Sequence, residues 1–291
     1  MKMFKTFLAV FFSILFSLFV VLNVFVFNIS LFADKNNIKK NIKNIDLVKE
    51  VNKVRNSGSV DNESKINKTI NEVYSVAKEY GVPERVVDEI INSDTTKNIL
   101  GVSAGNFMDY IINGSDFSFL SVDEAYNLIS KNVDKLINEV DIDISLGQKE
   151  KFLNRVKLEL PDIIDSFPKK EDLLASSYGK RIKMFQKMFN KSVKIVLIVG
   201  LTLSMIMVFI LKKIEAFNYL GIAMLLSGLI LAIFSFLIPS LLISGLNQAE
   251  LSIFAGSLID YLSKDFLISS IAVITLSIIS LLIFKFKYKV N

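Results

Sequence analysis

The stretch TFLAVFFSILFSLFVVLNVFVFNISLF occupies residues 6–32 and contains no charged side chain. About 18 or more apolar residues in a row can cross the roughly 30 Å hydrocarbon core of a bilayer as a helix. Three further runs have a similar length and character, at residues 193–211, 220–243 and 266–284. The sequence therefore predicts a membrane protein with four transmembrane helices.

The first apolar run is preceded by Lys2 and Lys5, as in a secretory signal peptide, and Ala33 follows it. The apolar region of a signal peptide spans about 7–15 residues, far fewer than this run, and Leu31 fits an A-x-A cleavage pattern poorly. An uncleaved N-terminal transmembrane anchor at residues 1–33 is the favoured interpretation.

The orientation follows from the lysines that flank the spans, because short cytoplasmic segments carry an excess of positive charge. Lysines flank the start of the first run, the junction of the second and third, and the end of the fourth: Lys2, Lys5, Lys212, Lys213, Lys285, Lys287 and Lys289. Both termini are therefore expected in the cytoplasm. Residues 34–192 then form an extracytoplasmic domain, and residues 193–291 form a three-span transmembrane bundle.

Charge is unevenly distributed over the expected outer domain. Residues 35–55 carry a net charge of +5, residues 56–179 of −9, and residues 180–194 of +6. This predicts an acidic body with two basic stems beside the membrane, where each lysine contributes about 1 kcal/mol to the attraction to anionic lipid.

The second stem has the clearer pattern. Five lysines share one face of a predicted helix: Lys180, Lys183, Lys187, Lys191 and Lys194. Ile182, Phe185 and Phe189 fall largely away from them. We expect a helix that contacts an anionic lipid membrane at headgroup level, with a solvated charged face as the alternative.

The acidic body is expected to be all-helical. Apolar residues recur at helical spacing between cap signals. Ser121 with Glu124, and Ser145 with Gln148, have the spacing of capping boxes. An apolar stripe at residues 66–80 predicts one helix, with a C-cap at Gly81, and Pro83 is expected in the first turn of the next. A third helix should begin with an N-cap at Ser93 and end at Gly114, and Gly101 and Gly105 weaken its middle. Pro161 ends one helix or opens another.

The transmembrane runs contain no central Asp, Glu, Lys or Arg, which argues against ion-coupled transport. Asn23 and Asn28 are interpreted as contacts between helices rather than as an ion path. Small residues and one proline in the third run indicate that it packs closely against other helices. The same small residues would also allow two copies of the chain to associate as a homo-oligomer. The positions concerned are Gly221, Ala223, Ser227, Gly228, Ala232 and Pro239, with a kink expected at the proline. A gate or substrate path is the alternative.

The outer segment between the third and fourth runs resembles a capped amphipathic helix. Asn247 and Glu250 have capping-box spacing, and apolar residues recur at helical intervals after them. We predict a short helix at residues 248–263 that lies on the outer leaflet or caps the bundle. A re-entrant loop is the alternative.

No catalytic, cofactor-binding or metal-binding motif is found. Cys, His and Trp are absent. The acidic cluster Glu139, Asp141 and Asp143 fails as a calcium loop, because Leu146 and Phe152 stand where Gly and Glu are required. The acidic body also argues against nucleic-acid binding. Thirty Lys against four Arg suggest an AT-rich bacterial genome.

Three functions remain open at this point. The first is a non-enzymatic scaffold, adaptor or sensor whose residues 56–179 bind another envelope protein or a wall polymer. The second follows from the order of the spans, which resembles that of FtsX- and MacB-type ABC permeases and implies a transport subunit. The chain departs from those permeases in two respects, because its outer body is expected to be wholly helical and its cytoplasmic pieces are very short. The third is a carboxylate-based cell-envelope enzyme.

Overall fold

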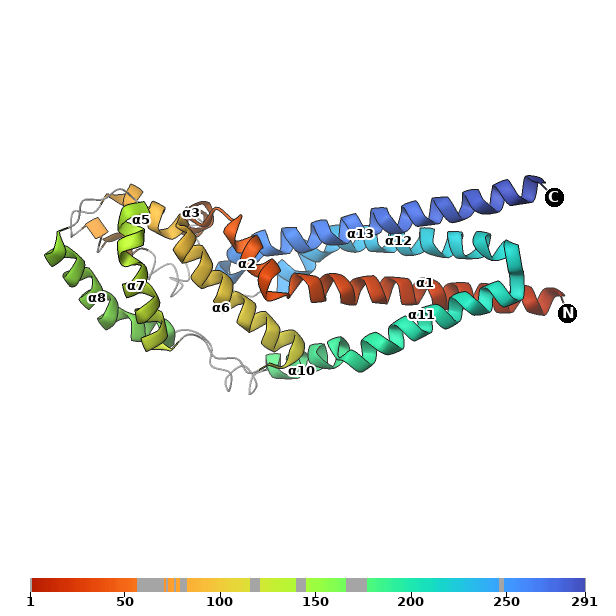
Figure 1. The fold of residues 1–291 in the computed structure, drawn as a ribbon, viewed down its shortest axis with the longest axis horizontal. Helices are drawn as coiled ribbons and strands as arrows, with labels where there is room; N and C mark the ends of the chain where they lie inside the picture. Colours follow the sequence, from red (N-terminus) through yellow and green to blue (C-terminus); the bar gives the residue numbers. More distant parts are fainter. Residues whose placement is uncertain are drawn as a thin grey trace. The chain divides into compact units, whose positions relative to one another are not determined.

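The computed structural model describes residues 2–56, 71, 73–75, 77–78, 83–115, 121–139, 145–165, 177–245 and 249–290. Within these residues all regular structure is helical, which confirms the expected all-α class (Figure 1). In chain order the elements are α1 (Lys2–Phe32), α2 (Lys35–Lys43), α3 (Leu47–Asn56), α5 (Glu84–Asn92), α6 (Asp94–Asn113), α7 (Val122–Glu139), α8 (Leu146–Asp165), α10 (Ser177–Phe189), α11 (Lys191–Lys212), the 3₁₀ turn η1 (Lys213–Glu215), α12 (Ala216–Gly245) and α13 (Ala249–Val290).

The chain divides into two compact units. The first comprises Met1–Phe32, Lys187–Asn247 and Leu258–Asn291, and the second comprises Ala33–Gln186 and Gln248–Ser257. Three helical segments in the described residues are long and apolar enough to cross a membrane, namely Lys2–Phe32, Lys191–Ser240 and Ile259–Lys287. All three belong to the first unit, which we call the bundle; the second unit is called the helical domain.

The middle apolar segment contains two helices that run in opposite directions. α11 ends at Lys212, η1 reverses the chain, and α12 returns (Figure 1). Lys213 has a positive φ of 48° at this turn. Figure 1 shows the start of α1, η1 and the end of α13 at the same end of the bundle. The lysines that flank the apolar runs are therefore brought together there.

α1 packs against α11 and α12 and also contacts α13. The Asn23 side chain donates a hydrogen bond to the Leu197 carbonyl of α11 at 3.0 Å. The Ser17 and Ser227 hydroxyls lie 2.9 Å apart between α1 and α12. Ser269 of α13 donates to the Asn28 side chain at 3.1 Å. The prediction that Asn23 and Asn28 join helices is confirmed.

α13 differs from expectation. It is continuous from Ala249 to Val290, so the segment predicted as a separate helix at residues 248–263 forms the first part of a 42-residue helix. The expected end at residue 263 is wrong, because Ser263, Lys264 and Asp265 include no Gly or Pro that would stop a helix. The side chains of residues 249–258 lie outside those that the structure describes.

Four of the predicted cap signals of the helical domain are confirmed. Ser121 and Glu124 exchange the two hydrogen bonds of a capping box, since each side chain accepts from the other's backbone N–H at 2.9 and 3.2 Å. Ser145 and Gln148 do the same at 3.0 and 3.3 Å before α8. Ser93 caps α6, which ends at Gly114 in the left-handed conformation. Pro83 precedes the first residue of α5 rather than occupying its first turn.

Pro161 does not end α8, which continues to Asp165. Proline removes one helical N–H and costs about 3 kcal/mol in a helix interior. The burial of Leu160 beside it, in a helix that packs against α7, offsets part of this cost. An ion pair between Lys149 and Asp134 also joins these two helices.

α3 and α5 form a second contact in the helical domain. The Asn92 side chain accepts from the Leu47 N–H at 2.9 Å and donates to Asp46 at 2.8 Å. This bond to Asn92 is the main reason why the pKa of Asp46 lies below its usual value. Val51, Tyr74 and Val87 form the core nearby. Most of the predicted stripe 66–80, Gly81, and Asp141 and Asp143 lie outside the described residues.

Candidate functional site

The predicted lysine face is divided between two helices. Lys180, Lys183 and Lys187 are exposed on α10, whereas Lys191 and Lys194 belong to α11. Asn190 separates the helices, because its backbone leaves the helical conformation and its side chain caps α11 by accepting from the Ser192 N–H at 3.0 Å. The expectation of one continuous face of five lysines is therefore wrong, since Asn is among the residues that most favour an N-cap.

The opposite side of α10 packs onto α6. Ile182 and Tyr110 are both buried and form a cluster with Phe107 and Ile111. The Gln186 side chain donates to the Tyr110 carbonyl at 2.9 Å. This contact leaves the three lysines of α10 facing away from α6, as the sequence pattern indicated. We call Lys180, Lys183 and Lys187 the α10 lysine face.

α2 packs onto the same helix, α6. An added Cβ at Gly101 would lie 3.0 Å from the Lys39 Cα, and one at Gly105 would lie 3.3 Å from the Lys35 Cα. The two glycines, four residues apart, thus let the backbones of α2 and α6 approach closely. Lys35 also forms an ion pair with Asp109 at 3.2 Å. Sequence reasoning treated both glycines only as weak points and missed this role.

Both chain connections to the bundle therefore meet one helix. α2 follows α1 directly, because Asp34 caps α2 with hydrogen bonds to Asn36 and Asn37. α10 precedes α11 by one residue, Asn190. α6 contacts α2 along its middle and α10 near its end. A displacement of α6 would consequently act on the segments that follow the first span and precede the second.

A pH dependence is expected from Asp109. The hydrogen bond from Asn113 is the main cause that holds the pKa of this carboxyl below its usual value, and Lys35 adds to it. A lowered pKa stabilises the folded state above the unfolded pKa of about 4, and this contribution is lost as pH falls below that value and through the lower folded pKa. Circular dichroism of the full-length protein should give a lower melting temperature at pH 3 than at pH 6, and Asp109→Asn should reduce this difference.

The predicted packing positions of the third run face different neighbours. Gly221 and Gly228 lie against α13, where an added Cβ would come within 2.8 Å of Leu281 and 2.5 Å of Ile274. Ala223 and Ser227 are buried, and Ser227 bonds to α1. Ala232 and Pro239 are half-buried, and α12 continues through the proline. Four of the six positions are thus packed or buried within a single chain.

Sequence reasoning missed a row of serines on α13. Ser263, Ser270 and Ser277 donate to the backbone carbonyls of Ser235, Gly228 and Gly221 on α12 at 2.5, 2.8 and 2.7 Å. Ser280 donates to Phe217 at 2.8 Å. The first three serines and their acceptors are each spaced seven residues apart, as in two antiparallel helices with a heptad register. This shared spacing is the signal that could have revealed the contact.

The serine row should contribute modestly to stability. Replacement of Ser277 by alanine removes one hydrogen bond between α13 and α12, and such bonds average about 0.6 kcal/mol inside membrane proteins. We expect a decrease of that size in the unfolding free energy of the purified full-length protein. Thr275→Val is the matched control, because Thr275 is exposed and donates to the Ile271 carbonyl of its own helix. An equal decrease for both variants would contradict a role in joining the helices.

Within the described ranges, no group of three or more acidic side chains could hold a metal ion. Comparison of the chain with known protein families, with curated proteins and with solved structures found no match.

Proposed function

We propose that the chain is a non-enzymatic, four-span protein of a bacterial cell membrane that serves as a scaffold, adaptor or sensor. Its N- and C-termini lie in the cytoplasm. The helical domain lies outside and binds another envelope protein through residues 56–179. The observation that carries this proposal is that α6 contacts both chain connections to the bundle, which would relay a binding event to the first and second spans.

Four spans are supported by the lengths of α11 and α12. With 22 and 30 residues, they would extend about 33 Å and about 45 Å, enough for each to cross the hydrocarbon core. The topology is supported by the lysines gathered at one end of the bundle, because lysines concentrate on the cytoplasmic side. The bundle serves as an anchor, since its serines and asparagines bond to neighbouring helices.

Single-cysteine labelling tests the topology directly, because the chain has no cysteine. Asn98 on α6, Lys213 in η1 and Lys285 near the end of α13 are all exposed. A membrane-impermeant maleimide should label Asn98→Cys in intact cells, and should label Lys213→Cys and Lys285→Cys only after the membrane is opened. Labelling of Lys213→Cys in intact cells would contradict the proposed arrangement.

Photo-crosslinking in living cells tests the partner. A photoreactive amino acid at exposed apolar positions of the helical domain, Leu100, Val102 or Phe152, should give an adduct of one defined mass. The same group at Phe236, an exposed position of α12, serves as the control and should yield lipid adducts only. Failure to trap protein at every domain position would contradict the proposal. Co-purification of an ATPase with the full-length protein would instead favour a permease subunit.

A further inference from the structure

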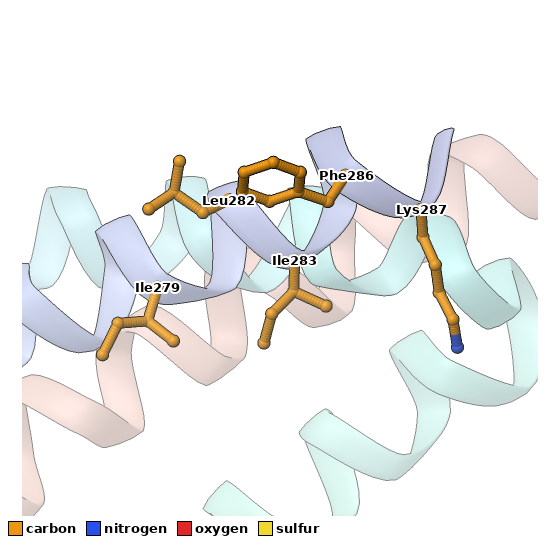
Figure 2. Close-up of a pocket in the computed structure, with 5 residues that line it drawn as sticks. All are labelled: Ile279, Leu282, Ile283, Phe286 and Lys287. Atoms are coloured by element: carbon orange, nitrogen blue, oxygen red, sulfur yellow. The ribbon is translucent and has the colours of Figure 1, made fainter. Parts of the chain in front are cut away.

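An apolar depression of about 540 Å³ lies on the surface of α13 near its C-terminal end (Figure 2). It is lined by Ile279, Leu282, Ile283, Phe286 and Lys287, all from this one helix. The spacing of these five residues places them on one stripe of the helix. Eight residues separate the first from the last, so the stripe extends about 12 Å along the axis.

The depression has one apolar side and one charged end. Figure 2 shows Ile279, Ile283 and Lys287 extending in one row from α13, with Leu282 and Phe286 in a second row beside it. The four apolar side chains are 40–69% exposed, with Phe286 the most exposed. They lie within the segment Ile259–Lys287, which is long and apolar enough to cross a membrane. In a bilayer this surface faces lipid.

Lys287 supplies a positive charge at one end of the depression. The side chain is exposed, and no Asp or Glu follows Asp265 in the sequence. Lysines near the ends of transmembrane helices extend their ammonium groups to the level of the lipid headgroups. An anion attached to a hydrocarbon chain would match both the charge of Lys287 and the apolar stripe beside it.

We propose that this depression binds one anionic phospholipid, with an acyl chain along Ile279, Leu282, Ile283 and Phe286 and the phosphate at Lys287. The stripe of about 12 Å covers most of one leaflet, which is about 15 Å thick in a core of about 30 Å. The site depends only on α13 being in a membrane, and it goes beyond the function proposed for the helical domain.

A second copy of the chain fits this surface less well. Stable protein interfaces bury about 800 Å² on each partner, which four side chains of a single helix do not supply. A two-fold dimer of parallel spans through this stripe would also bring the two Lys287 side chains together. Like charges at that distance are destabilising.

The absence of tryptophan from the chain allows a direct test. Phe286→Trp places a single fluorophore in the depression, and Phe236→Trp places one at an exposed apolar position of α12, which has no Lys or Arg. The full-length variants are reconstituted in vesicles that contain either brominated phosphatidylglycerol or brominated phosphatidylcholine. In the Phe286→Trp variant, quenching should show that the anionic lipid binds about 5-fold more strongly than the zwitterionic lipid, in keeping with about 1 kcal/mol per lysine near anionic lipid. In the Phe236→Trp variant, the two lipids should bind equally.

Two lysine substitutions separate a bound lipid from general attraction to the surface. In the Phe286→Trp background, Lys287→Gln should remove the preference for the anionic lipid, whereas Lys285→Gln should retain most of it, because Lys285 does not line the depression. Equal loss in both variants, or equal quenching by both lipids in the parent, would overturn the proposal. Weak quenching by both lipids would indicate a second protein chain on this surface and would also overturn it. Far-UV circular dichroism checks that each variant is folded.

Discussion

Replacement of Gly228 by leucine should destabilise the bundle by about 2–3 kcal/mol, the upper part of the range for overpacked cores. A Cβ at this position would lie 2.5 Å from the Ile274 Cγ1 and 3.3 Å from the Ile274 backbone nitrogen. The backbone nitrogen cannot move without a shift of α13, and Ile274 has one strongly preferred χ1 rotamer in a helix, so a rotamer change would relieve the clash only at a cost. The unfolding free energy of the purified full-length protein in mixed micelles measures the effect.

The same substitution should also disturb the serine row. Ser270 reaches the Gly228 carbonyl at 2.8 Å, and a separation of α12 from α13 would lengthen this bond. Ser240→Leu is the control, because Ser240 is exposed on α12 and donates to the Leu237 carbonyl of its own helix. Ile274→Ala combined with Gly228→Leu should recover part of the lost stability, since it removes the obstructing Cγ1. An additive double variant would contradict direct contact between the two positions.

Local signals predicted the helices of the helical domain well. Capping boxes at Ser121 and Ser145 and the helix end at Gly114 depend on side chains only one turn away, so sequence spacing determines them. The continuation of α8 through Pro161 was not predictable in this way, because the burial of Leu160 and the packing of α8 against α7 are tertiary features.

Contacts between distant segments were largely invisible in the sequence. The spacing of Ser263, Ser270 and Ser277 has meaning only when paired with the spacing of their acceptors on α12, which requires the register of the two helices. The lysine pattern of α10 predicted which side is exposed, because helical periodicity carries that information. It could not predict the break at Asn190, because this residue can either continue the helix or leave the helical conformation and cap α11.

Substitution of Gly101 by valine should weaken the contact between α2 and α6 more than any charge change on its surface. The added side chain would meet the Lys39 Cα at 3.0 Å, and a backbone atom can move only if the whole of α2 shifts. We expect a loss of about 2 kcal/mol, as for other overpacked sites. The ion pair between Lys35 and Asp109 is more than half exposed on the lysine side, and such surface pairs contribute at most about 1 kcal/mol.

Hydrogen exchange of the α2 amides in the full-length protein measures this loss, because a decrease of about 2 kcal/mol in opening free energy accelerates exchange roughly 30-fold. Gly147→Val is the matched control, since no described atom outside its own helix lies within 4 Å of a Cβ there. This control should leave the exchange of α2 unchanged. Equal acceleration in both variants would show that valine acts on the whole domain. Acceleration in Gly101→Val alone, extending to α10, would show that α6 couples the two chain connections on which the proposed sensing role depends.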